Sequence, residues 1–309
     1  MVLTGGSSGI GRAAAHAFAE EGSRIVLAAR GAPALASVER ECRARGCEAV
    51  QVPTDVRDEA AVDALRDAAL ERFGAIDVWV NCAGVMVYGD FEQIPGAVFR
   101  RVIETNLFGQ VHGARAVLPV FRRQGSGVLI NMASVWGRVT TPGVSAYVTS
   151  KFAVRAFSEC LRQELRDVDG VDVATMLPAA VDTPVFDNAG NVSGRRIRPI
   201  PPLLDPEEIA TGIVHCARDP KREVTYGANA RVLEMIHAVA PGLYERFAPP
   251  AFSAGNFARE AWERHSGNVL EPSTHHAIHG GWRSSRRREL TRAMAAAVGA
   301  AVLGLLGRR

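Results

Sequence analysis

Short apolar runs alternate with longer amphipathic stretches over the first 180 residues of the chain. The apolar runs are continuous, as in strands that are buried on both faces, and the amphipathic stretches are rich in Ala, Leu, Arg and Glu, as helices are. This alternation predicts an α/β fold, in which helices cover both faces of a doubly wound parallel sheet. The predicted strands are Val2–Thr4, Arg24–Ala28, Ala49–Val52, Ile76–Asn81, Val128–Met132 and Val171–Leu177, and the predicted helices include Arg12–Glu21, Glu59–Phe73, Val98–Arg123 and Tyr147–Val168.

The pattern changes after Pro184, where glycines, prolines and arginines interrupt it. This composition predicts a long loop with at most short helices over residues 185–205. Because long loops in compact domains usually act as lids or binding loops, we expect this one to be a substrate lid. The elements predicted beyond the lid are a helix from Pro206 to Arg218 with Asp205 as its cap, a last strand at Glu223–Tyr226 and a last helix at Ala228–Phe247.

Regularity fades from Pro249 onward, so we expect a catalytic domain over residues 1–248 and a C-terminal extension over residues 249–309. Residues 249–282 are typical of an irregular arm that wraps the surface or is partly disordered. The uncharged run Ala293–Gly307 predicts an apolar helix at about 290–307, which at roughly 22 Å is shorter than the roughly 30 Å hydrocarbon core of a bilayer. Three interpretations compete: a helix docked on protein, a peripheral membrane contact, and a frayed tail.

Composition and charge exclude several classes of protein. Of 309 residues, 47% are hydrophobic and 22% charged, which rules out a disordered chain, a collagen-like repeat and a polytopic membrane protein. A net charge of +3 gives no support for binding of nucleic acid. The five cysteines are scattered without CxxC spacing and are predicted to be reduced thiols. With no signal-peptide pattern at the N-terminus, these features predict a cytoplasmic protein.

A glycine-rich loop, Thr4-Gly5-Gly6-Ser7-Ser8-Gly9-Ile10-Gly11, follows the first strand and opens the first helix. The backbone N–H groups of such a loop and the N-terminus of the helix bind a pyrophosphate, and glycine permits the close approach. An ordinary strand-to-helix turn is the simpler interpretation of the loop alone. Its position between a strand and a helix favours a nucleotide site.

Tyr147 and Lys151 lie four residues apart and share one face of a helix. A free tyrosine has a pKa of about 10, and a neighbouring ammonium favours its phenolate. Tyr147 could then exchange a proton with a substrate oxygen, and the hydroxyl of Ser134 could hydrogen-bond the same oxygen. Such a pair is also common on helix surfaces, so the prediction depends on the nucleotide loop upstream.

The glycine loop, Asn81-Cys82-Ala83-Gly84 and Tyr147-xxx-Lys151 together resemble the short-chain dehydrogenase/reductase family over about residues 1–245. The resemblance implies a Rossmann-type sheet of about seven parallel strands that binds NAD(P). It implies Asn106, Ser134, Tyr147 and Lys151 as catalytic residues, with Asn106 holding a water in a proton relay. The cofactor-binding residues that it implies are Gly5, Ser7, Ser8, Gly9, Ile10 and Gly11 at the phosphates and ribose, Asp55 and Val56 at the adenine, Asn81, Ala83 and Gly84 at the adenine ribose, Tyr147 and Lys151, and Pro178, Val181 and Thr183 at the nicotinamide.

Cofactor choice depends on the end of the second strand. NAD-dependent enzymes of this type place an acid there to bond the ribose hydroxyls, and this chain has Ala29 followed by Arg30. An arginine binds a 2′-phosphate through charge-assisted hydrogen bonds, whereas an acid would repel it. The sequence therefore favours NADP(H), although Arg30 could also be a solvated surface residue.

Taken together, the motifs predict an NADP(H)-dependent oxidoreductase that interconverts an alcohol and a ketone or aldehyde. The alternatives are a non-catalytic Rossmann nucleotide-binding scaffold and an epimerase or dehydratase on the same fold. We expect a small-molecule carbonyl or alcohol substrate, no nucleic-acid partner and a homo-oligomer. One cluster of histidines suggests a metal site: His275, His276 and His279. The surrounding prolines and glycines favour a solvated loop instead, so no metal is predicted.

Overall fold

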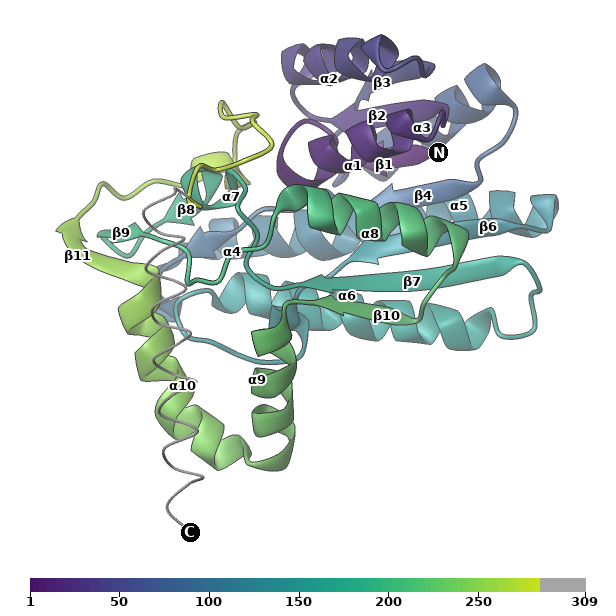
Figure 1. Ribbon diagram of the computed structural model, residues 1–309. Helices are drawn as coiled ribbons and strands as arrows, with labels where there is room; N and C mark the ends of the chain where they lie inside the picture. Colours follow the sequence, from purple (N-terminus) through teal and green to yellow (C-terminus); the bar gives the residue numbers. More distant parts are fainter. Residues whose placement is uncertain (284–309) are drawn as a thin grey trace.

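The computed structural model describes residues 1–283 and contains a parallel sheet of seven strands (Figure 1). The strand order is β10-β7-β6-β4-β1-β2-β3. From β1 the sheet grows first to one side, through β2 and β3, and then to the other side from β4 onward, as in doubly wound folds. The α/β fold with a Rossmann-type sheet is confirmed. The strands of this sheet are β1 (Val2–Thr4), β2 (Ile25–Ala29), β3 (Ala49–Pro53), β4 (Val78–Asn81), β6 (Gly127–Met132), β7 (Val171–Pro178) and β10 (Glu223–Tyr226).

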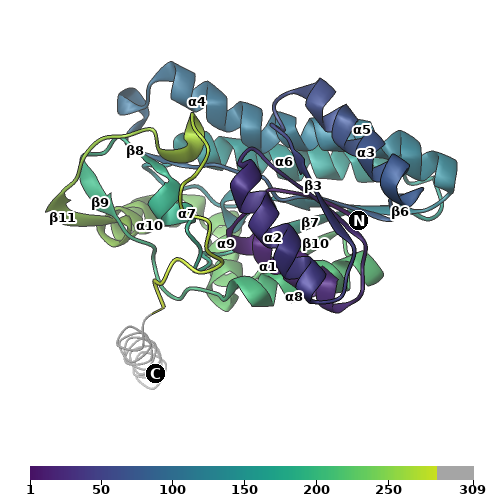
Figure 2. The same cartoon turned by 90° about the horizontal axis from the view of Figure 1, so that it is seen from above.

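Helices cover both faces of the sheet (Figure 2). Successive residues of the central strands point to opposite faces, so Leu3 and Val80 pack against one helical layer while Val2 and Trp79 pack against the other. Two apolar cores result, which explains why these strands are continuous apolar runs. The first layer contains α1 (Gly9–Glu20), α2 (Ala32–Ala44) and α8 (Pro206–Arg218), and the second contains α3 (Glu59–Phe73), α5 (Gly109–Gln124) and α6 (Ser145–Glu164).

The helix predicted over Val98–Arg123 is not uniform. It consists of α4 (Gly96–Ile103), a π-helical turn at Glu104–Phe108, and α5. The wider turn places Asn106 in the protein interior, fully buried. Such π turns are frequent at functional sites, and the hydrophobic period of 3.6 residues does not predict them.

The segment predicted as a lid loop has more structure than expected. It contains the short helix α7 (Val185–Asn188) and the strands β8 (Gly190–Asn191) and β9 (Arg195–Ile197). β8 pairs with β5 (Val87–Tyr88) and β9 with β11 (Phe257–Ala261), both distant in sequence. Asp205 is the N-cap residue of α8, as predicted, but its side chain accepts no capping hydrogen bond and instead forms an ion pair with Arg283.

The last helix also differs from its prediction. Residues 228–247 do not form one helix but contribute to α9 (Ala228–Val239) and α10 (Pro241–Asn256), because Pro241 starts a new helix. The helix expected to end near Phe247 therefore continues past the predicted domain boundary at 248. Residues 268–283, called the C-terminal strap below, then return across the molecule toward α1 and α7 (Figures 1 and 2).

The predicted apolar helix at about 290–307 lies outside the described residues, and so do its proposed docking and membrane contacts. Among the helices of residues 1–283, none combines the length and the apolar character that crossing a bilayer requires.

Candidate active site

A cavity of about 470 Å³ lies at the carboxyl ends of the parallel strands, beside the glycine loop. This edge of a doubly wound sheet is where such folds bind ligands. The structure brings nearly all of the predicted site residues to this cavity and leaves out only Asn81 and Asn106. Those that line it are Gly5, Ser7, Ser8, Gly9, Ile10, Gly11, Arg30, Asp55, Val56, Ala83, Gly84, Ser134, Tyr147, Lys151, Pro178, Val181 and Thr183.

The glycine loop is packed too tightly for larger residues. Gly5 has a φ of 71°, in the left-handed region that favours glycine. A Cβ atom on Gly11 would lie 2.1 Å from the carbonyl oxygen of Gly5. The loop therefore turns sharply into α1, and Gly9, Ile10 and Gly11 line the cavity at the N-terminus of this helix, where backbone N–H groups lack intrahelical partners.

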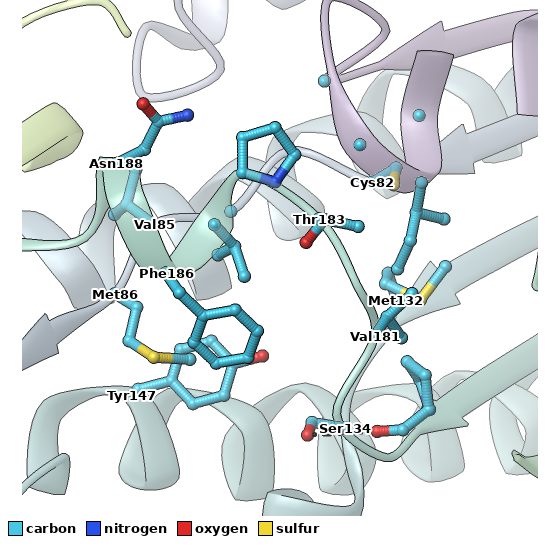
Figure 3. Close-up of a pocket in the computed structure, with 18 of the residues that line it drawn as sticks. Cys82, Val85, Met86, Met132, Ser134, Tyr147, Val181, Thr183, Phe186 and Asn188 are labelled. Carbon is cyan, nitrogen blue, oxygen red and sulfur yellow. Dashed lines mark hydrogen bonds between the residues drawn. The ribbon is translucent and has the colours of Figure 1, made fainter. Parts of the chain in front are cut away.

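Tyr147 and Lys151 both project from α6 toward the cavity, as predicted. The Lys151 Nζ atom donates to the carbonyl oxygen of Met132 at 2.8 Å and lies 5.4 Å from the centre of the Tyr147 ring. Ser134 follows β6; its Oγ accepts from the N–H of Trp136 at 3.2 Å and donates to the carbonyl oxygen of Pro178 at 3.4 Å. Figure 3 shows Tyr147 and Ser134 on the same side of the cavity, with Phe186 beside the phenol ring.

Burial shifts the pKa values of this pair in opposite directions. It raises the pKa of Tyr147 to about 12, although a hydrogen bond with Ser134 lowers it in part. It lowers the pKa of Lys151 to about 8. At neutral pH the protein alone therefore holds a protonated phenol, which can donate a proton, beside an ammonium that is close to its titration range.

Asn106 does not reach the cavity, because its amide is used within the fold. Its Oδ1 accepts from the N–H of Val85 at 2.8 Å, and its Nδ2 donates to the carbonyl oxygen of Val85 at 2.9 Å and to the Oγ of Ser150 at 3.0 Å. A Cβ atom on Gly84 would lie 3.5 Å from this Oδ1 and 3.8 Å from the Lys151 Nζ. Asn106 thus fixes the backbone beside Lys151, and its water-relay role stays a prediction.

Asn81, which is predicted to contact the adenine ribose, does not line the cavity. The side chain is buried, accepts from the indole N–H of Trp79 at 2.8 Å, and donates to Gln110 and Asn131. These bonds use the amide to join β4, α5 and β6. Backbone at Ala83 and Gly84 lines the cavity instead.

Sequence analysis missed four cavity residues in the C-terminal strap: Asn268, Pro272, Ser273 and His276. They lie more than 230 positions after Arg30, in an irregular segment without periodicity, so no local pattern predicts their contact with the site. Arg30 does reach the cavity, but its Nη2 donates to the strap carbonyl oxygens of Asn268 at 2.7 Å and Glu271 at 3.1 Å. It is therefore no solvated surface residue.

A first prediction concerns Lys151 and pH. Its pKa is about 8 in the folded protein and 10.5 in an ordinary environment, so between these values the unfolded chain binds more protons. The free energy of unfolding therefore rises with pH across this window on account of Lys151. We expect Lys151→Met to remove this rise, so that wild type gains stability relative to the variant between pH 8 and 10.5. Urea unfolding of both proteins at a series of pH values measures the difference, and a difference independent of pH would contradict the shift.

A Rossmann-type sheet with a glycine cradle, a buried lysine and a cavity-lining tyrosine at its carboxyl edge defines the class of NAD(P)-dependent oxidoreductases. The family model for short chain dehydrogenase matches residues 1–192. The chain belongs to the short-chain dehydrogenase/reductase family.

Relatives in this family share about a third of the sequence. The chain is 33% identical to "Uncharacterized oxidoreductase YxnA" of Bacillus subtilis, covering 80% of this chain and 70% of that protein. It is 32% identical to "Dehydrogenase/reductase SDR family member 7B" of Bos taurus, covering 80% and 79%.

Two solved structures show the same fold with bound nucleotide. An alcohol dehydrogenase from Thermococcus sibiricus, complexed with 5-hydroxy-NADP, has a TM-score of 0.63 and 30% identity over 73% of this chain and 94% of its own. A short-chain dehydrogenase/reductase from Burkholderia phymatum, in complex with NAD, has a TM-score of 0.71 and 28% identity over 78% and 93%. Nicotinamide nucleotides of both kinds thus occur among the structural neighbours.

Proposed function

We propose that the protein is an NADP(H)-dependent oxidoreductase that interconverts an alcohol with a ketone or aldehyde. The observation that carries this proposal is the convergence of Tyr147, Ser134 and Lys151 on one cavity beside the glycine loop. A nucleotide scaffold without turnover would have no use for a buried ammonium beside a phenol. The alcohol dehydrogenase from Thermococcus sibiricus, which binds a derivative of NADP, supports the same reaction class.

The cavity suits a dinucleotide, because Gly5 and Gly11 let the loop pack tightly against neighbouring backbone and line the cavity at the N-terminus of α1. When bound, the cofactor supplies or accepts the hydride. In the direction of reduction, the Tyr147 hydroxyl donates a proton to the carbonyl oxygen of the substrate, and the Ser134 hydroxyl orients that oxygen by a hydrogen bond. The Lys151 ammonium stabilises the phenolate that results. In the direction of oxidation the Tyr147 phenolate takes the proton from the alcohol.

The lid over residues 185–205 is proposed to select the substrate. Val185, Phe186 and Ile200 line the same cavity as Tyr147 and Trp136, so the surroundings of the proton donor are largely apolar. A pocket of this character favours carbonyl compounds with an apolar substituent.

We also retain the domain over residues 1–248, the cytoplasmic location, the homo-oligomer and the membrane contact through residues 290–307 as predictions.

A panel of aliphatic and aromatic ketones and aldehydes, with NADPH oxidation followed at 340 nm, tests the proposed function. We expect at least one compound to be reduced with net consumption of NADPH. Tight NADPH binding without net oxidation by any compound would favour a scaffold, an epimerase or a dehydratase.

A second prediction concerns cofactor choice. Arg30 carries the positive charge at the end of β2 where NAD-dependent enzymes carry an acid. We expect Arg30→Asp to lower the preference for NADPH over NADH by about 10- to 100-fold, because a charge-assisted bond to the 2′-phosphate is replaced by repulsion. Dissociation constants for both cofactors measure the shift. Arg40→Asp, which makes the same change of charge at an exposed position of α2, is the control. A wild type that binds NADH more tightly would refute the proposed preference.

A further inference from the structure

The C-terminal strap lines the cavity between Asn268 and His276 and continues to the loop after β7. Its first residues meet Arg30, at the end where the sequence predicts the adenosine. Farther along, the carbonyl oxygen of Ala277 accepts from the N–H of Gly9 at 2.9 Å, and that of His276 accepts from Arg12 at 2.7 Å. The strap ends at Asp182, beside the predicted nicotinamide loop. It therefore contacts residues from the end of β2 to the loop after β7.

The far end of the strap is firmly attached. Both carboxylate oxygens of Asp182, which is only 3% exposed, accept backbone N–H groups of the strap, from Trp282 at 2.9 Å and from Arg283 at 3.0 Å. Two ion pairs join the strap to α8 and the residue before it: His279 with Glu207, and Arg283 with Asp205. These bonds fix the end of the strap to α8 and to the loop after β7, whose residues Val181 and Thr183 line the cavity.

The near end of the strap adds a wall to the adenosine side. A second cavity of about 320 Å³ adjoins the first there and shares Arg30, Thr54, Asp55 and Pro272 with it. Leu270 lines this second cavity from the strap. Apolar faces of Leu270 and Pro272 thus lie opposite the loop after β3, which is predicted to contact the adenine.

Two polar side chains of the strap each carry a buried atom that forms no hydrogen bond within residues 1–283. Asn268 and His276 both line the main cavity, and Asn268 Oδ1 and His276 Nδ1 are buried without a hydrogen-bond partner within residues 1–283. Buried polar atoms normally have a partner, because leaving one unpaired costs free energy. Burial and the nearby Arg12 lower the pKa of His276, so its ring is neutral near pH 7 and one nitrogen can accept a hydrogen bond.

We propose that the strap completes the adenosine half of the cofactor site, and that Asn268 and His276 bind the adenosine of NADP(H) by hydrogen bonds once the cofactor is present. Arg30 is held in place for this site by the carbonyl oxygens of Asn268 and Glu271. The strap lies outside the segment that the family model matches, so the contact is an addition of this chain's C-terminal extension. This inference rests on the proposed use of a dinucleotide cofactor.

Binding of two nucleotides to strap variants tests the proposal without turnover. NADPH contains the adenosine, and reduced nicotinamide mononucleotide lacks it. We expect Asn268→Ala and His276→Ala each to raise the dissociation constant of NADPH by about three- to tenfold, the range for one ordinary hydrogen bond. The dissociation constant of the mononucleotide should stay unchanged. His276→Gln, which retains polar atoms, should recover part of the affinity, and His275→Ala, an exposed neighbour whose side chain does not line the cavity, is the matched control.

Each other outcome decides against the proposal in a distinct way. Unchanged NADPH binding would show that the strap does not touch the adenosine, and tighter binding would show that it competes with the cofactor. Equal losses for both nucleotides, with lowered melting temperatures, would show a purely structural role. A wild type that binds neither NADPH nor NADH would overturn the proposed function itself, whereas wild-type turnover with unaffected strap variants would overturn this inference alone.

Discussion

Tyr147→Phe is expected to reduce kcat by about 100- to 10,000-fold while NADPH still binds with nearly wild-type affinity. The substitution removes only the hydroxyl oxygen, and general acid–base catalysis normally contributes a factor of this size. The ring keeps its contacts with Trp136 and Lys151, so the cavity should retain its shape. Steady-state reduction of the best carbonyl substrate, together with fluorescence titration of NADPH, measures both quantities.

Tyr244→Phe provides the control for this prediction. Its hydroxyl donates to the carbonyl oxygen of Thr140 at 2.6 Å and lies outside the cavity, so the same chemical change should leave kcat largely intact. If Tyr147→Phe kept more than about a tenth of the wild-type kcat, Tyr147 would not be the proton donor.

Gly11→Ala is expected to weaken NADPH binding by about 100-fold or more. The added Cβ atom would lie 2.1 Å from the Gly5 carbonyl oxygen and 2.8 Å from its carbon, so loop and helix must move apart. Both atoms belong to the backbone and have no rotamer to change. A displacement of about 1 Å in a binding constellation can cost this much. Isothermal titration with NADPH measures the loss, and circular dichroism shows whether the fold persists.

Gly96→Ala makes the same addition at the start of α4, where nothing lies within 4 Å of the new atom. It should bind NADPH like the wild type. A folded Gly11→Ala protein with unchanged affinity would mean that the glycine loop does not carry the pyrophosphate.

Much of the fold was predictable because its signals are local. Leu3 and Val80, or Val2 and Trp79, belong to apolar runs short enough for strands, and the alternation of these runs with helical stretches restricts the topology to a parallel doubly wound sheet. The spacing of Tyr147 and Lys151 and the position of the glycine loop were enough to place these groups at one cavity. They lie at strand ends or on one helix face, which the sequence pattern fixes.

The remaining features depend on contacts between distant segments. β9 forms only against β11, and Arg30 meets carbonyl oxygens some 240 positions later. Asn81 and Asn106 show a different difficulty, because their surroundings decide whether an amide faces a ligand or bonds to the fold. The hydrophobic periodicity of the sequence does not predict which of the two an amide does.

Transfer of deuterium from NADPH labelled at nicotinamide C4 tests the central claim most directly. With the best carbonyl compound of the panel, we predict that a deuteride from one face of the cofactor appears at the carbinol carbon of the product, one atom for each NADPH oxidised, and that Tyr147→Phe slows this transfer by at least tenfold. Product formed without label, or conversion of substrate without oxidation of NADPH, would contradict the account.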